Sequence, residues 1–174
     1  MAEKIRALVL EPGFTHMGYW TELMLYAASR AQHVHELIKP ALNQGKHVVC
    51  DRFTASTLAY QGYGRGLDLE KVEQIAQIAE DGCQPDLTIF LDLPIEIALQ
   101  RRKERGQNPD RMELEGIELQ DRAALGYRKI ASLVGEKALV IDAVDSPEAI
   151  SRKIWSELVS RWSSFPKVER NHEQ

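Results

Sequence analysis

The sequence predicts an α/β fold in which a parallel sheet is flanked by helices. Three short apolar runs are predicted to be buried strands, and each stops at an aspartate: 47–50 at Asp51, 87–91 at Asp92, and 138–141 at Asp142. Short apolar runs without alternation are typical of strands that are covered on both faces, as in parallel sheets. Segments with helical periodicity separate these runs, as parallel connections require. We therefore expect one acidic edge of the sheet, where folds of this class bind their ligands.

Length and composition limit the classes of function. The 174 residues suffice for one domain with a single core, which we place at residues 1–162, followed by a polar tail at 163–174 that we expect to be disordered. A net charge of -4 argues against a protein that binds a nucleic-acid backbone. The apolar runs are too short to span a membrane. Two cysteines, Cys50 and Cys83, form neither a disulfide framework nor a zinc pattern, so we expect a reducing cytoplasm.

The first quarter of the chain is predicted to be helical. Residues 2–10 place apolar side chains on one face, and Pro12 stops this helix. A longer helix is expected to begin with Thr21 as its cap, to be kinked at Pro40 and to end at Gly45.

Two pairs of side chains in this region are candidates for ligand binding. Tyr26 and Arg30 are four residues apart and share a helical face, where a ring beside a guanidinium could hold a heterocyclic base; the alternative is a tyrosine that packs on an arginine stem. Asp51 could hold a metal-bound water or take a proton, and Arg52 could bind a phosphate. The alternative for that pair is a surface salt bridge after a core strand.

The later helices have clear start and stop signals. Asp68 is expected to cap a helix that Gly82 ends, and Pro94 suits the first turn of the next helix. Ser146 and Pro147 are expected to open the last helix. For Asp92 and Asp142, we expect structural roles at the strand ends.

A basic segment lies between the last two predicted strands. Residues 101–111 hold five positive and two negative side chains, and the middle of this segment, 106–109, is predicted to be a flexible hinge. A cationic helix end followed by a mobile loop suits closure over a polyphosphate, where arginines neutralise developing charge. The alternative is a solvated helix face with incidental charges.

Four motifs together resemble the bacterial thymidylate kinase (dTMP kinase) family: YAASRAQHV at 26–34, CDRFTASTLAYQGYGRGLD at 50–68, PDLTIFLDLP at 85–94, and RRKERG with DRME within 101–113. Their order and spacing agree with the family from about the first helix to the last strand. The resemblance implies a P-loop-kinase-like, three-layer parallel sheet flanked by helices. It also implies an enzyme that phosphorylates dTMP to dTDP in dTTP biosynthesis, with ATP as the donor and Mg²⁺ as the cofactor. Such an enzyme would be a cytoplasmic homodimer without nucleic-acid or membrane partners.

The resemblance implies which residues surround the phosphates. Arg52 matches the arginine that holds the acceptor monophosphate, and Asp51 matches its acidic neighbour near magnesium and the transferring phosphoryl group. Arg101, Arg105 and Arg111 match the arginines of family members that carry them in the lid rather than in the phosphate loop. These five residues are the implied catalytic set, with Asp51 as the implied Mg²⁺ ligand.

The resemblance also implies which residues hold the nucleoside. Tyr26 stands where the family usually has a phenylalanine that stacks on thymine, and Arg30 matches the arginine that reaches the thymine edge. Thr57 and Gln61 match positions that hydrogen-bond the base. Tyr60 matches the ring under the sugar that disfavours a 2′-hydroxyl.

One part of the family pattern has no counterpart in this sequence. The family begins with a strand, a G-x-x-x-x-G-K-[ST] phosphate loop, a helix and a second strand, and no residue here matches that loop. Because the first of those strands would lie between two of the predicted strands, we expect exposed sheet edges and a poorly stable chain without kinase activity. A start assigned too late and a truncated gene are our two hypotheses for this difference.

Two other functions remain alternatives. A deoxynucleoside-kinase relative would share the acid-arginine pair near its substrate, although the A-Y-Q-G run with Thr57 and Gln61 favours a monophosphate acceptor. A non-catalytic nucleotide-binding remnant would bind dTMP without turnover.

Overall fold

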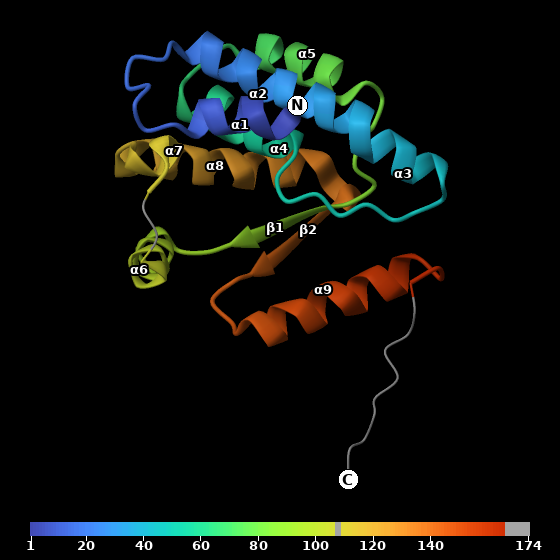
Figure 1. The fold of residues 1–174 in the computed structure, drawn as a ribbon. Coiled ribbons are helices and arrows are strands. Elements are labelled where there is room, and N and C mark those ends of the chain that lie inside the picture. The colour runs from blue at the N-terminus through green and yellow to red at the C-terminus, as the bar shows by residue number, and fades with distance from the viewer. Residues whose placement is uncertain (107–108, 166–174) are drawn as a thin grey trace.

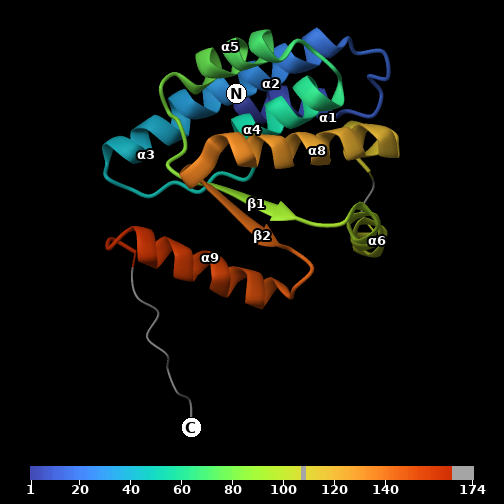
Figure 2. The same ribbon diagram turned by 180° about the vertical axis from the view of Figure 1, so that it is seen from behind.

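The computed structural model describes residues 1–106 and 109–165 and has an α/β architecture. A layer of helices rests on the long helix α8, a small sheet lies beneath α8, and α9 lies beneath the sheet (Figure 1). The same order is seen from behind (Figure 2). The elements, in chain order, are α1 (Ala2–Leu10), α2 (Tyr19–His33), η1 (Val34–Ile38), α3 (Lys39–Asn43), α4 (Thr54–Thr57), η2 (Leu58–Gly64), α5 (Leu69–Glu80), β1 (Thr88–Asp92), α6 (Ile95–Arg105), α7 (Arg111–Leu114), α8 (Ile117–Val134), η3 (Gly135–Lys137), β2 (Ala138–Asp142) and α9 (Pro147–Arg161).

The sheet in the described part of the chain consists of β1 and β2, which are parallel as predicted. Phe90 lies beside Val140 in the register, and Asp92 lies beside Asp142. Phe90 is buried in the core cluster with residues of η2 and α8, whereas Ile141 is buried on the α9 side. The sheet is therefore covered by a helix on each face, and its two terminal aspartates meet at one edge.

The prediction of a strand at 47–50 is wrong. These residues form irregular backbone without a ladder to the described sheet, and the side chain of Val49 is 91% exposed. The apolar pattern alone is insufficient, because a strand forms only where a neighbour accepts and donates its backbone hydrogen bonds. Asp51 consequently does not end a strand of the described sheet, as Asp92 and Asp142 do.

The helix over residues 2–10 is confirmed, but the expected start of the second helix is wrong. Helix α2 begins at Tyr19, with Gly18 rather than Thr21 in the cap position. Before Pro40 the backbone widens into the π-helical turn η1, which is one way in which a helix accommodates a proline that lacks an N–H. Gly45 follows the end of α3 with φ +71°, as a glycine past a helix end should.

The predicted caps of the later helices are confirmed in two cases. The Asp68 side chain accepts a hydrogen bond from the Lys71 backbone N–H at 3.0 Å, and Ser146 accepts one from the Ala149 N–H at 3.2 Å. Pro94 occupies the cap position of α6 and not its first turn.

The core lies where η2 and α8 meet above β1. Ala59, Phe90 and Ile130 are buried in one cluster. Gly126 makes the close approach of η2 and α8 possible, because a Cβ at this position would lie 2.8 Å from the Tyr63 side chain. This contact fixes the segment that contains the predicted substrate residues against the rest of the fold.

The beginning of the predicted polar tail packs on the body of the protein. The Phe165 ring stacks on His47 at a centroid distance of 4.3 Å and contacts the rings of Trp155 and Trp162. The remainder of the predicted tail, 166–174, lies outside the described residues. Among the described helices, none combines the length and the hydropathy that a membrane span requires.

Candidate nucleotide-binding site

Two rows of polar side chains face each other between α2 and the segment formed by α4 and η2. The residues in each row are four apart, a spacing that brings side chains to one face of a helix. One row is Glu22, Tyr26 and Arg30, and the other is Thr57, Gln61 and Arg65. Contacts at the two ends of the rows show that they run antiparallel, since Arg30 bonds to Thr57 while Glu22 bonds to Gln61 and Arg65. We call these six residues the polar ladder.

Arg30 forms one end of the polar ladder. Its Nη2 donates hydrogen bonds to the buried Thr57 hydroxyl at 2.6 Å and to the Phe53 carbonyl at 3.1 Å, and its guanidinium lies 5.2 Å from the centre of the Phe53 ring. Burial lowers the pKa of Arg30 from its usual value. The Nη1 atom is also buried and has no hydrogen-bond partner among the described residues. A buried guanidinium with a free donor is suited to a ligand that presents an acceptor.

Glu22 forms the other end and is fully buried. Its carboxylate accepts hydrogen bonds from Gln61 Nε2 at 2.9 Å, from Arg65 Nη2 at 2.9 Å and from Arg111 Nη2 at 2.6 Å. Burial raises the pKa of Glu22, but the hydrogen bonds from Arg65, Gln61 and Arg111 outweigh this effect and hold the pKa below its usual value. Glu115 adds a second carboxylate 2.5 Å from Arg65 Nη2, so the network contains two acids and two arginines.

Tyr26 lies between these two ends on α2 and is partly buried. Burial and the neighbouring charge of Glu22 raise the pKa of Tyr26 to about 12, so its hydroxyl is neutral at physiological pH. The structure thus places an aromatic ring with a neutral hydroxyl one helical turn from Arg30, on the same row.

Arg52 is held at the turn that precedes α4. Its backbone is left-handed, with φ +67°, a conformation that costs about 1–2 kcal/mol in a residue with a side chain. The guanidinium lies 5.3 Å from the centre of the Tyr60 ring, and that ring makes an edge contact with Tyr127 of α8 at 6.1 Å. The Tyr127 hydroxyl donates to Ser56 at 2.7 Å. Residues from α4, η2 and α8 therefore form the surroundings of the strained, exposed Arg52.

Asp51 is exposed beside Arg52. Within the described residues, no three His, Cys, Asp or Glu side chains converge in a way that could hold a metal ion. A single carboxylate is nevertheless compatible with Mg²⁺, because this ion is commonly bound through one or two carboxylates together with substrate phosphates and water. Asp51 fits that role only with a phosphorylated ligand beside it.

Arg101 and Arg105 on α6 make contacts within the chain. Arg101 donates to the backbone carbonyls of Ala143 at 2.8 Å and Val144 at 3.0 Å, which follow β2. Arg105 pairs with Glu113 at 2.6 Å on the surface. Two residues of the predicted hinge, 107 and 108, lie outside the described part of the chain.

Arg111, the third predicted lid arginine, is buried at the start of α7. Its Nε donates to the Val9 carbonyl at 2.7 Å, and its Nη2 bonds to Glu22. In this conformation its guanidinium belongs to the network around Glu22, whereas Arg101 and Arg105 bond to other partners.

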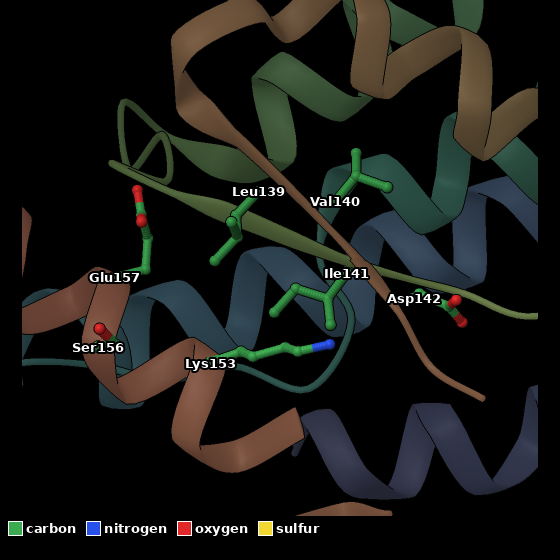
Figure 3. A pocket seen from close by; sticks show the side chains of 7 residues that line it. All are labelled: Leu139, Val140, Ile141, Asp142, Lys153, Ser156 and Glu157. Carbon is green, nitrogen blue, oxygen red and sulfur yellow. The ribbon is translucent and has the colours of Figure 1, made fainter. Parts of the chain in front are cut away.

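The hollows at the sheet lie elsewhere. An open hollow of about 400 Å³ between β2 and α9 is lined by residues that include Leu139, Asp142 and Lys153 (Figure 3). A second hollow of about 320 Å³ lies at the strand ends, where Arg128 pairs with Asp92. Neither lining includes a residue of the polar ladder, so these hollows are separate from the candidate site.

Sequence reasoning missed several residues of this site: Glu22, Phe53, Arg65, Tyr127. The signal for Glu22 was available, because it precedes Tyr26 by four residues, just as Tyr26 precedes Arg30. Tyr127 carries no such signal, because it comes from α8, more than 60 residues from its partners in the sequence.

Comparisons with known proteins show which family the chain resembles in sequence. The family model described as thymidylate kinase matches residues 1–154. A thymidylate kinase of Synechococcus sp. is 49% identical over 140 residues, which cover 80% of this chain and 66% of the relative. A thymidylate kinase of Lactobacillus acidophilus is 44% identical, covering 92% of this chain and 75% of the relative, and one of Syntrophotalea carbinolica is 42% identical, covering 89% and 74%. The chain thus spans about two thirds to three quarters of the length of these relatives.

Proposed function

This chain belongs to the thymidylate kinase family, and we propose that its residues form the dTMP-binding part of an enzyme that transfers a phosphoryl group from ATP to dTMP, which yields dTDP and ADP. The observation that carries the proposal is the buried Nη1 of Arg30, which has no partner among the described residues. A guanidinium can only donate hydrogen bonds, and the pyrimidine of dTMP offers carbonyl oxygens as acceptors. Tyr26, one turn away, supplies a neutral ring for stacking.

Arg52 is the proposed ligand of the acceptor phosphate. Its strained backbone and its contact with the Tyr60 ring support this role, since strain is retained where the surrounding structure fixes a side chain for function. Tyr60 would then lie under the sugar. Mg²⁺, when bound with ATP, would neutralise charge on the transferring phosphate, and Asp51 is the carboxylate placed to contact it.

The lid arginines differ in how readily they could turn to a donor phosphate. The pair of Arg105 with Glu113 is exposed, and exposed ion pairs contribute little, so Arg105 can exchange partners at small cost. Among the described residues, Arg101 bonds to the backbone carbonyls of Ala143 and Val144. Arg111 is buried against Glu22, so a role at the donor phosphates requires the polar network to open.

The proposal includes the finer architecture and the assembly of the family. A parallel sheet between α8 and α9 supports a three-layer P-loop-kinase arrangement. Exposed apolar side chains on the long helical segment, among them Trp20, Met24 and Leu37, support a homodimer packed through that segment. A cytoplasmic location and the absence of nucleic-acid partners remain parts of the same proposal.

A thermal-shift comparison of dTMP with thymidine tests the acceptor assignment. The two ligands share the base and the sugar and differ only in the phosphate that Arg52 is proposed to hold. We expect dTMP to raise the melting temperature clearly more than thymidine does. Equal shifts would favour a deoxynucleoside-kinase relative, and no shift with either ligand would contradict the proposal.

A second candidate function is nucleotide binding without catalysis. The observation that favours it is the burial of Arg111 against Glu22, which keeps this predicted lid arginine away from a donor phosphate. This candidate shares the dTMP site and differs in predicting no turnover with ATP even after a phosphate-loop segment is restored to the chain.

A further inference from the structure

The amide of Gln61 is held in one orientation by Glu22. Gln61 Nε2 donates to Glu22 Oε1 at 2.9 Å, and both side chains are almost fully buried. An ionised carboxylate can only accept hydrogen bonds, so the nitrogen of the amide, and not its oxygen, must point toward Glu22. The Gln61 oxygen therefore remains available as an acceptor on the other side of the amide.

Glu22 is itself immobilised by charged partners. Arg65 contacts both carboxylate oxygens, at 3.2 and 2.9 Å, and Arg111 contacts one at 2.6 Å. These arginines come from the end of η2 and from α7, so three parts of the chain meet on one carboxylate. A group held in this way can fix the rotation of a neighbouring amide, which would otherwise turn by 180° at little cost.

We propose that Glu22 is a positioning residue that orients the Gln61 amide for thymine and against cytosine. The inference rests on the proposed function, in which the pyrimidine lies beside Tyr26 and Arg30. Thymine carries a hydrogen-bond donor at N3 and an oxygen at C4, whereas cytosine carries an acceptor at N3 and an amino group at C4. The fixed oxygen of Gln61 accepts from the N3–H of thymine and opposes the N3 lone pair of cytosine. Arg30 can only donate hydrogen bonds, so it also favours thymine, whose C4 oxygen accepts them, over cytosine, whose C4 amino group does not.

The test compares the affinity for dTMP with that for 5-methyl-dCMP, which keeps the methyl group, sugar and phosphate and changes only the N3 and C4 edge. In Glu22→Gln the new amide can either accept from or donate to Gln61, so the orientation is no longer fixed. We expect the ratio of the two dissociation constants, measured by calorimetry, to fall about tenfold, as the loss of one discriminating hydrogen bond implies. Glu118→Gln is the matched control, because it makes the same change in an exposed carboxylate that pairs with Arg122 outside the polar network. We expect it to leave the ratio unchanged.

An unchanged ratio in Glu22→Gln, or an equal loss in both variants, would overturn the proposal. A measurement on the wild-type chain decides the case in which Glu22→Gln does not fold. Side-chain amide NMR should show one Gln61 proton that is protected from exchange and shifts when dTMP binds. Two rapidly exchanging Gln61 amide protons would overturn the fixed orientation. This outcome can be observed without dTMP, so it is distinguishable from a failure to bind dTMP, which would contradict the proposed function.

Discussion

At the scale of single residues, the recognition of dTMP is proposed to depend most on Arg30. Lysine in its place keeps the charge but lacks the planar fork that bonds Thr57 and presents a second nitrogen to a ligand. We expect Arg30→Lys to weaken dTMP binding by about 1.5–3 kcal/mol, the usual contribution of hydrogen bonds to charged groups. Calorimetric titration measures this loss.

The control for this change is Arg128→Lys. Arg128 pairs with Asp92 on the surface, away from the polar ladder, and its replacement should leave dTMP affinity unchanged. Equal affinities in wild-type protein and Arg30→Lys would show that Arg30 does not contact the ligand.

Tyr26 gives a prediction about alkaline pH. Its pKa is raised from 10.0 to about 12 in the folded protein, chiefly by burial. Because the folded state binds the proton more tightly than the unfolded state, the resulting stability is fully present below pH 10 and is lost as the pH rises from 10 to 12. We expect Tyr26→Phe to reduce the fall in unfolding free energy over this range, as followed by urea titrations at several pH values.

Tyr19→Phe is the matched control for the pH experiment, because the Tyr19 side chain is exposed on the same helix. Tyr19→Phe should leave the fall in the free energy of unfolding between pH 10 and 12 as it is in the wild type. A profile for Tyr26→Phe that coincides with the wild-type profile would contradict the buried, neutral hydroxyl.

Part of the site could be predicted from single residues, and part could not. The spacing of Tyr26 and Arg30 on one helical face was visible in the sequence, and the structure places both on the polar ladder. The orientation of the Gln61 side-chain amide could not be predicted from the sequence, because its burial against Glu22 depends on how α2 and η2 pack. The periodicity of a helix predicts which of its faces carries a residue, but it does not predict which other element packs against that face.

At the scale of elements, α7 is joined to α2 by Arg111, and this junction predicts a stability difference between Arg111 and Arg105, two of the predicted lid arginines. Arg111 is buried between Glu22 and the Val9 carbonyl, whereas Arg105 pairs with Glu113 on the surface. Removing one partner of a buried ion pair costs about 3–5 kcal/mol. We expect Arg111→Met to lower the free energy of unfolding by about this amount in urea titrations.

Arg105→Met is the comparison for this experiment and should cost no more than about 1 kcal/mol, as exposed pairs do. Similar losses in both variants would mean that Arg111 is not held in the buried network. If Arg111 has this structural role, its position in a basic segment was a misleading sign of a lid function.

The elements that were predicted well are those fixed by local chemistry. The caps at Asp68 and Ser146 were recognisable because a side-chain oxygen satisfies backbone donors within the next three residues. The segment 47–50 was not predictable in this way. Its apolar residues suit a strand, but strand formation depends on a neighbouring backbone that local sequence does not specify.

At the scale of the whole molecule, the small sheet leaves apolar side chains in water. Val49 is 91% exposed, and Leu91 and Val140 are each more than half exposed. Leu91 and Val140 lie on the strands of the sheet, and burial of a side chain of this kind would contribute about 1.5–3 kcal/mol. The earlier expectation of low stability for the isolated chain therefore remains a prediction with a structural basis.

The chain as a whole is expected to bind dTMP without converting it. The sequence offers no glycine-rich loop with its lysine to cradle the phosphates of ATP, and binding of the acceptor alone cannot drive transfer. We expect no dTDP when the purified 174-residue protein is incubated with dTMP, ATP and Mg²⁺ and the products are separated by chromatography. ATP-dependent formation of dTDP would contradict this expectation.

The most direct test is a crystal structure of the chain with dTMP. We predict that the phosphate lies within hydrogen-bond distance of the Arg52 guanidinium, with the pyrimidine against Tyr26 and one of its carbonyl oxygens on Arg30 Nη1. A nucleotide in the hollow between β2 and α9, or an Arg52 side chain turned away from the phosphate, would contradict the proposed site.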